Sequence, residues 1–278
     1  MIYLLKHLAI FKYVAVTLFL CLLCSGANAA NETDFLKLWQ LHMKQPDQHA
    51  EVVEACRDFV TKNRVDELIK VVQGVEAWHL LKSGQEKDAI ALLQSHLSNG
   101  ERGPDAGAAI LAKAWLSRLD LEDVKQALQL YYRKEVGYPE RLDDLTGHPG
   151  TPPTLKYSLT DRWNRPWSYR LTGLKSTPGF RNQHYSIACT KLADSSNIND
   201  GLALPYAGSI NVRATGITTI QGGRSIVELA TWHNGREQGQ RVQLGVDRIT
   251  GDIFLAYVGS KLIIVCDHNH WKVLPKPR

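Results

Sequence analysis

Apolar side chains recur every three or four positions through most of the first half of the chain, which is the spacing that places them on one face of an α-helix. Residues 31–136 are therefore predicted to be helical. Asp105 is placed to cap the last and longest helix, Gly137 ends it, and Pro139 forbids its continuation. The apolar positions are Phe35, Leu38, Trp39, His42; Val52, Val53, Cys56, Phe59, Val60; Leu68, Val71, Val72, Val75, Trp78, Leu81; Ala89, Leu92, Leu93, Leu97; and Leu111, Ala114, Trp115, Leu119, Val124, Leu128, Tyr131, Tyr132, Val136.

Two of these helices are joined at Ser83-Gly84, where glycine suits a left-handed cap residue. Small and apolar residues from Ala77 to Leu93 have the spacing of one tetratricopeptide-type helical hairpin, in which alanines let two helices approach closely. A generic helical bundle is the alternative interpretation.

The last part of the chain alternates apolar with polar or small residues, the period of a β-strand. Val227, Leu229 and Thr231 alternate in this way before an Asn234-Gly235 turn signal, and further short apolar runs follow. They predict an antiparallel meander or a small barrel. The fold class is therefore α+β: N-terminal helical hairpins, a long helix packed on a small antiparallel sheet, and a C-terminal β-region.

The chain starts with the order of a secretory signal peptide. A short basic stretch with Lys6 and Lys12 precedes the apolar run 13–24, and Ala27-Asn28-Ala29 is a small-residue cleavage signal. We expect cleavage after Ala29 and a periplasmic or extracellular mature protein. An uncleaved N-terminus that anchors the protein in the inner membrane is the alternative.

Composition narrows the functional classes. The formal net charge of +5 falls to +3 when Lys6 and Lys12 are removed, and no basic block typical of nucleic-acid binding is present. Cys56, Cys189 and Cys266 would remain in the mature chain, with no Cys-x-x-Cys pair to suggest zinc or thioredoxin chemistry. Two predictions stay open for them: a Cys189–Cys266 disulfide, since both lie in strand-like runs, or buried free thiols.

A central segment carries a more specific signal. A helical run from Leu121 to Tyr131 is followed by a Gly-Tyr-Pro stop and then by an Asp-Arg-Trp-Asn-Arg-Pro-Trp-Ser-Tyr run that starts at Asp161. Residues 120–203 thereby resemble the periplasmic domain of type II secretion major pseudopilins. The residues that carry this structural signature are Gly137, Tyr138, Pro139, Asp161, Trp163, Asn164, Pro166 and Tyr169.

The resemblance implies a helix, a loop, a tight turn and a small antiparallel sheet. Asp161 is expected to accept backbone N–H bonds in the turn, and Asn164 to take the left-handed conformation that the family usually gives to glycine. The chain departs from the family at its N-terminus, since no acidic residue precedes Glu32 and a helical region stands where the filament anchor would be.

The family also binds calcium in an acidic loop. The corresponding residues here are Asp194, Asn197, Asn199 and Asp200, whose side chains offer the hard oxygen ligands that calcium prefers. A solvated polar loop is the alternative, and no other cofactor is expected.

The last region, residues 204–278, resembles the homology-region β-domain of secretion clamp subunits and pilus lipoproteins, through the strand-like runs after Gly216. The domain prediction is accordingly a signal peptide at 1–29, a helical region at 30–104, a pseudopilin-like α+β domain at 105–203 and a β-domain at 204–278.

Motifs for catalysis are missing from the sequence, and the His268-Asn269-His270 pair of histidines lies in an expected turn without a third ligand nearby. We therefore expect a non-enzymatic envelope protein that binds other proteins of the envelope or secretion apparatus, with no nucleic-acid or small-molecule partner. One alternative is a periplasmic helical-repeat scaffold that shares only the pseudopilin fold. An enzyme whose site is assembled from distant residues, such as His184, Asp200 and His233, is the other.

Overall fold

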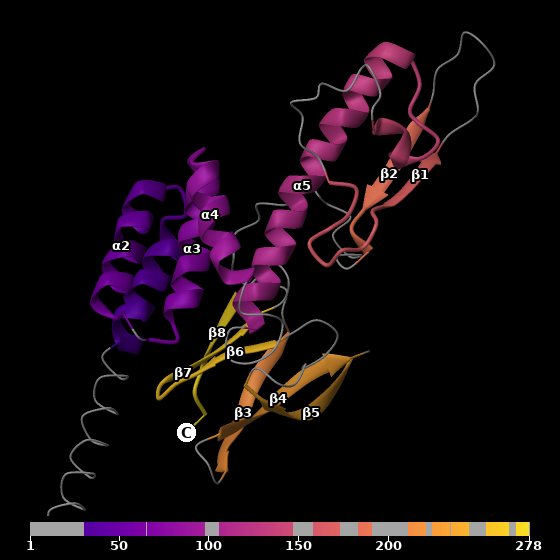
Figure 1. Cartoon of the computed structure of the whole chain (residues 1–278). Helices are drawn as coiled ribbons and strands as arrows, with labels where there is room; N and C mark the ends of the chain where they lie inside the picture. The colour runs from indigo at the N-terminus through magenta and orange to yellow at the C-terminus, as the bar shows by residue number, and fades with distance from the viewer. Residues whose placement is uncertain are drawn as a thin grey trace, which may run out of the picture.

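The protein combines a helical half with three small antiparallel sheets (Figure 1), which confirms the mixed helix-and-sheet class. The computed structural model describes residues 31–64, 66–97, 106–146, 158–172, 183–190, 211–220, 224–233, 235–244, 254–266 and 271–277. The expected signal peptide and the Asp105 cap lie outside these residues.

The helices follow the predicted stripes. Residues 31–44 form the first helix, followed by α2 (His49–Lys62), α3 (Ile69–Lys82), α4 (Glu86–Leu97), α5 (Ala106–Glu135) and the short 3₁₀ helix η1 (Leu142–Leu145). Each of α2 to α5 contacts the next along the chain, and α3 is buried on nearly every side because α2, α4 and α5 all pack against it. The tetratricopeptide-like character of this region stays a prediction.

The turn after α3 forms as its glycine predicts. Gly84 is left-handed, with φ 78°, and the N–H groups of Gly84 and Gln85 donate to the carbonyls of Leu81 and Leu80 at 3.1 and 2.8 Å. These two bonds are a Schellman motif, which satisfies carbonyls that the helix end would otherwise leave open.

The end of α5 differs from the prediction in one residue. The helix stops at Glu135, but the left-handed residue that follows is Val136, with φ 57°, and not Gly137. Glycine at position 137 instead allows a close approach of the Gln183 side chain, because a Cβ atom there would lie 3.1 Å from Oε1 of Gln183. That oxygen accepts the backbone N–H of Tyr138 at 2.9 Å.

The strands form three separate antiparallel sheets. Their bounds are β1 (Ser168–Thr172) and β2 (His184–Ala188); β3 (Val212–Ile220), β4 (Arg224–His233) and β5 (Arg236–Gln243); and β6 (Phe254–Val258), β7 (Leu262–Cys266) and β8 (Trp271–Pro275). Pairing of His233 with Arg236, and a left-handed Gly235 at φ 75°, confirm the predicted turn. Within the described ranges the meander is confirmed in each three-stranded sheet, and no closed barrel forms.

The sheet β6–β7–β8 joins the two parts of the molecule. Every residue of β7 is buried, because the strand has a core on each face. Ile263 and Val265 point into a cluster shared with β3, β4 and β5, whereas Leu262, Ile264 and Cys266 belong to the large cluster that includes the helices. The two faces follow directly from the two-residue period of a strand.

The first helix is tied to this sheet by a buried carboxylate. Glu32 accepts the backbone N–H groups of Ser260 and Lys261 at 2.5 and 2.6 Å, and also the hydroxyls of Tyr257 and Ser260 at 3.2 and 3.1 Å. Burial, and then the nearby Glu32 carboxylate, raise the pKa of Tyr257, so its hydroxyl stays a donor. Glu32 thus fixes the β6–β7 turn from more than 220 residues away in the sequence.

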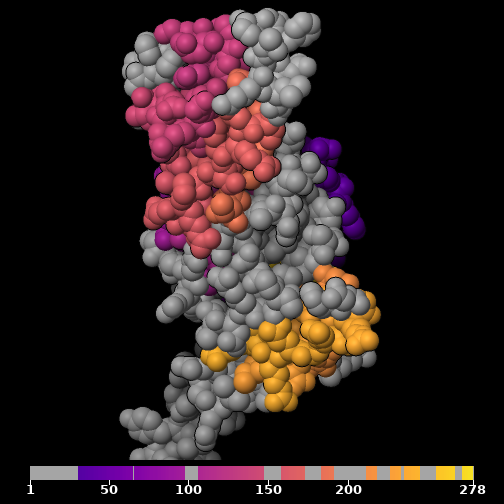
Figure 2. Space-filling model, turned by 90° about the vertical axis from the view of Figure 1, so that its right-hand side faces the viewer, coloured from indigo at the N-terminus to yellow at the C-terminus, as the bar shows by residue number. Residues whose placement is uncertain are grey.

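The long helix α5 spans the molecule (Figure 1). Its N-terminal end contacts β6, and its C-terminal part shares a hydrophobic cluster with Trp167 and Ile187 near the β1–β2 sheet. The side of the molecule that lies at the right of Figure 1 shows the end of α5 with β1 and β2 at the top and the β3–β5 sheet at the bottom (Figure 2).

Candidate functional site

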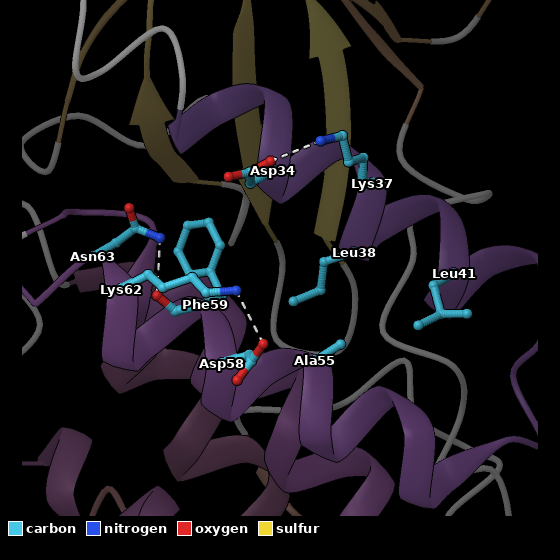
Figure 3. Close-up of a pocket in the computed structure, with 9 residues that line it drawn as sticks. All are labelled: Asp34, Lys37, Leu38, Leu41, Ala55, Asp58, Phe59, Lys62 and Asn63. Carbon is cyan, nitrogen blue, oxygen red and sulfur yellow. Dashed lines mark hydrogen bonds and ion pairs between the residues drawn. The ribbon is translucent and has the colours of Figure 1, made fainter.

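An open groove lies between the first helix and α2 (Figure 3). Its volume is about 290 Å³, and Leu38, Leu41, Ala55 and Phe59 provide its apolar surface. Phe59 and Leu38 are almost fully buried at its base. The groove therefore offers a narrow apolar strip to a partner side chain, and no serine, threonine, cysteine or histidine is among the described residues that line it.

The rim of the groove is charged. On the first helix Lys37 pairs with Asp34 at 2.9 Å, and on α2 Lys62 pairs with Asp58 at 3.0 Å. Figure 3 shows these pairs on the two walls, each formed within its own helix. Exposed pairs of this kind stabilise a helix by about 0.5 kcal/mol or less, so both lysines can exchange partners readily.

Three histidines meet beside this groove, one from each of the first three helices. His42 Nδ1 lies 2.8 Å from His79 Nε2, and His79 Nδ1 lies 3.0 Å from His49 Nδ1. We call these three residues the histidine chain. His42 and His79 are completely buried, whereas His49 is half-buried. Since both ring nitrogens of His79 are occupied by different histidines, the three rings form a line and do not converge on one point.

The environment keeps the inner histidines neutral. Burial lowers the pKa of His42 to about 4; burial, and then the neighbouring His42 and His49, lower that of His79 to about 3. Trp78 packs edge-on against His42, with ring centroids 5.8 Å apart. His42 Nε2 is buried and has no hydrogen-bond partner among the described residues. The chain therefore ends inside the protein with one unsatisfied nitrogen.

The turn that carries the pseudopilin-like signature is organised by Asp161. Its Oδ1 accepts the N–H groups of Trp163 and Arg165 at 2.8 and 2.9 Å, and its Oδ2 accepts the thiol of Cys189 at 3.1 Å. Asn164 is left-handed, with φ 59°. Both expectations, for Asp161 and for Asn164, are confirmed.

The same turn is bound to α5 by its arginine. Arg162 makes a bidentate pair with Asp120, at 2.5 and 2.7 Å, and its backbone N–H donates to Ser117 Oγ at 3.0 Å. Trp167 donates its indole N–H to the carbonyl of Ser158 at 2.7 Å. These contacts hold the turn against the middle of α5 and give its residues a structural role.

Tyrosines cover the junction between the end of α5 and the β1–β2 sheet. Tyr138 packs against Tyr132 and Tyr185, with ring centroids 4.7 Å apart in each case. Tyr169 donates its hydroxyl to the carbonyl of Pro139 at 2.8 Å, and burial raises its pKa. The Gly-Tyr-Pro stop and Tyr169, expected as parts of one structural signature, therefore lie together.

The disulfide alternative is wrong. Cys56, Cys189 and Cys266 are all buried, and none of the three forms a disulfide. The thiol of Cys189 donates a hydrogen bond to Asp161. The sulfur of Cys266 packs closely against Gly107 of α5, where an added Cβ atom would lie only 2.7 Å from it. The two strand-like runs that suggested pairing belong to different sheets, which their local patterns do not reveal.

The candidate calcium ligands Asp194, Asn197, Asn199 and Asp200 lie outside the described residues, as do His268 and His270. Among the residues that the structure does describe, no group of three or more histidine, cysteine, aspartate or glutamate side chains is arranged to hold a metal ion. Of the residues considered for a distant enzymatic site, His184 and His233 lie in β2 and β4, and Asp200 is not described.

Sequence reasoning missed the histidine chain and the Glu32 contact. In the sequence, His42 stands out only as a member of the apolar stripe of the first helix, and His49 and His79 belong to no recognisable motif. One signal was available: His79 follows Trp78 on a helix that is apolar on nearly all sides, so its ring had to be buried. Glu32 offered none, because its partners are more than 220 residues away.

Comparison with protein-family models, with curated proteins and with solved structures gave no match. The resemblance to pseudopilins and to the clamp-subunit β-domain therefore stays a prediction. In the described part of the chain, every helix is too short or too polar to cross a lipid bilayer.

Proposed function

We propose that the chain is a non-enzymatic protein-interaction component of the cell envelope, related to type II secretion or pilus-type assembly. The observation that carries the proposal is the turn at Asp161. Its carboxylate accepts two backbone N–H groups and Asn164 is left-handed, as the resemblance to pseudopilins requires. Signature residues of this kind support a fold and need no bound substrate.

The groove in Figure 3 supports the interaction part of the proposal. A helix laid into such a groove places an apolar side chain between the walls and can exchange salt bridges with rim charges such as Lys37 and Asp58. The groove is open and its charges are exposed, so binding there requires little rearrangement.

A free-standing periplasmic scaffold is the second candidate, and the Glu32 contact favours it. Glu32 holds the start of the first helix against the C-terminal sheet, in the part of the chain where a filament subunit would carry its anchor helix. A helix used in this way belongs to the protein's own core.

Site-specific photo-cross-linking in cells tests both candidates. The cross-linking residue replaces Lys37 at the groove. Arg141 serves as the matched control position, because its side chain is equally exposed and pairs with Asp143 at 2.9 Å, but it does not line the groove. Partners from Lys37 that belong to the secretion or pilus apparatus support the proposal. Enrichment of another envelope protein supports the scaffold, and equal recovery from both positions contradicts a role for the groove.

A further inference from the structure

We propose that the histidine chain is an acid-sensitive latch. It holds the C-terminal end of the first helix against α2 and α3 at neutral pH, and it releases that end when the three rings take up two protons. The inference goes beyond the proposed function, since it concerns how one part of the molecule is controlled. It rests on the two N···N contacts of 2.8 and 3.0 Å that join three different helices through His79.

The number of free lone pairs in the three rings sets how many protons are needed to open the latch. A neutral imidazole has one N–H and one lone pair, so three rings have three of each. The two hydrogen bonds use two N–H groups and two lone pairs, and one lone pair remains at an outer nitrogen. One added proton fits that lone pair and leaves both bonds intact. A second proton must take a lone pair that accepts a bond, so one bond breaks and two positive charges lie within the line of three rings.

The charged surroundings do not compensate for this second proton. Lys82 on α3 lies over the Trp78 ring, 5.5 Å from its centroid, and adds positive charge near the chain. The nearest carboxylate on the same helix, Glu76, is paired with Arg57 of α2 at 2.9 Å. Burial and the neighbouring rings already lower the pKa of His79 to about 3, which agrees with a site that resists charge.

The position of the histidine chain confines the opening to one end of the first helix. His42 lies near the C-terminal end of the first helix, and the short non-helical segment 45–48, which contains Pro46, follows it. This segment gives the C-terminal end of the helix room to move, while Glu32 keeps the start of the helix against the β6–β7 turn. Movement of the first helix would separate Leu38 from Phe59 and widen the groove of Figure 3.

Hydrogen–deuterium exchange of the whole mature chain tests the latch as the pH is lowered from about 6.5 to 4.5. Release by two protons predicts that amide protection in residues 31–44, corrected for the intrinsic exchange rate, falls on the order of 100-fold per pH unit at its steepest. Protection in the C-terminal half of α5 should change far less. Simultaneous loss in both regions would overturn the proposal.

Variants separate the latch from a general effect of buried histidines. The double variant His42→Leu/His79→Leu should lose the steep pH dependence in residues 31–44. His96→Leu is the matched control, because His96 is also buried and burial lowers its pKa to about 4, but it lies on α4 outside the chain. An unchanged pH dependence in the double variant contradicts the latch.

A second measurement applies if the double variant does not fold. Proton NMR of the imidazole rings in the unaltered protein should show His42 and His79 titrating over the same pH range in which residues 31–44 lose protection. Titration of both rings near the ordinary value of 6.5, with the helix still protected, would overturn the proposal.

Discussion

Two buried polar centres in this protein, the turn at Asp161 and the histidine chain, are built in opposite ways. At Asp161 both carboxylate oxygens accept hydrogen bonds, from two backbone N–H groups and from the thiol of Cys189. In the histidine chain every partner of a titratable ring is another titratable ring, and His42 Nε2 has none.

The difference shows what decides whether a buried polar group is a fixed support or a sensor. A charge that is fully satisfied by fixed donors is insensitive to modest changes in solution conditions. A line of imidazoles that bond to one another keeps all its hydrogen bonds only while its rings are largely neutral, and loses one of them on further protonation.

Acid should destabilise the protein mainly through its buried histidines. The folded-state pKa values of His42 and His79, about 4 and 3, lie below the ordinary 6.5, so the unfolded chain binds more protons below that pH. Stability is therefore full above pH 6.5 and falls as the pH decreases towards those values. At about pH 4.5 the two groups together should cost about 5 kcal/mol, which urea unfolding at several pH values would measure. An unfolding free energy that is flat down to this pH would contradict the prediction.

Removal of the Asp161 carboxylate should have a large effect at neutral pH. Asp161→Ala leaves two backbone N–H groups and the Cys189 thiol without their acceptor, and should reduce the free energy of unfolding by about 3 kcal/mol. Asp161→Asn keeps an oxygen acceptor at the same position and should lose roughly half as much. Urea denaturation at neutral pH compares the two, and equal losses would show that the charge, and not the acceptor, is what matters.

The Glu32 contact should behave like the Asp161 turn. Glu32→Ala removes the acceptor for the backbone N–H groups of Ser260 and Lys261 and should cost about 2–3 kcal/mol. Thr33→Ala is the matched control, since its hydroxyl accepts a hydrogen bond from the exposed side chain of Lys261, and its loss should cost about 1 kcal/mol or less. Thermal unfolding monitored by circular dichroism measures both, and similar losses would contradict a special role for Glu32.

Most local features could be predicted from the sequence because short-range chemistry fixes them. The stripes of the helices, the Gly84 cap, the Asn234-Gly235 turn and the left-handed Asn164 each depend on a few adjacent residues. The division of the last strands into two sheets could not be predicted, because β7 has an unbroken apolar run that suits either a barrel or a strand between two cores.

The functional features were predictable only in part, for a related reason. Asp161 and its turn partners lie within five residues of one another, so the local sequence is enough to predict their hydrogen bonds. The histidine chain joins residues 37 and 30 positions apart, and Glu32 joins residues 228 apart. Contacts of this kind depend on how whole helices and sheets pack, which periodicity does not specify.

The smallest predicted effect concerns the strained residue at the end of α5, Val136. A β-branched side chain in the left-handed region costs about 1–2 kcal/mol, and Val136 is exposed, so its side chain gains little from packing in return. Val136→Asn should therefore raise the free energy of unfolding by about 1 kcal/mol, since asparagine tolerates this conformation. Val136→Ala is the control, because it removes the branching but keeps a Cβ and should recover only part of the gain. Urea unfolding measures both variants. If Val136→Asn is neutral or destabilising, the valine side chain makes contacts that offset the strain of its left-handed backbone.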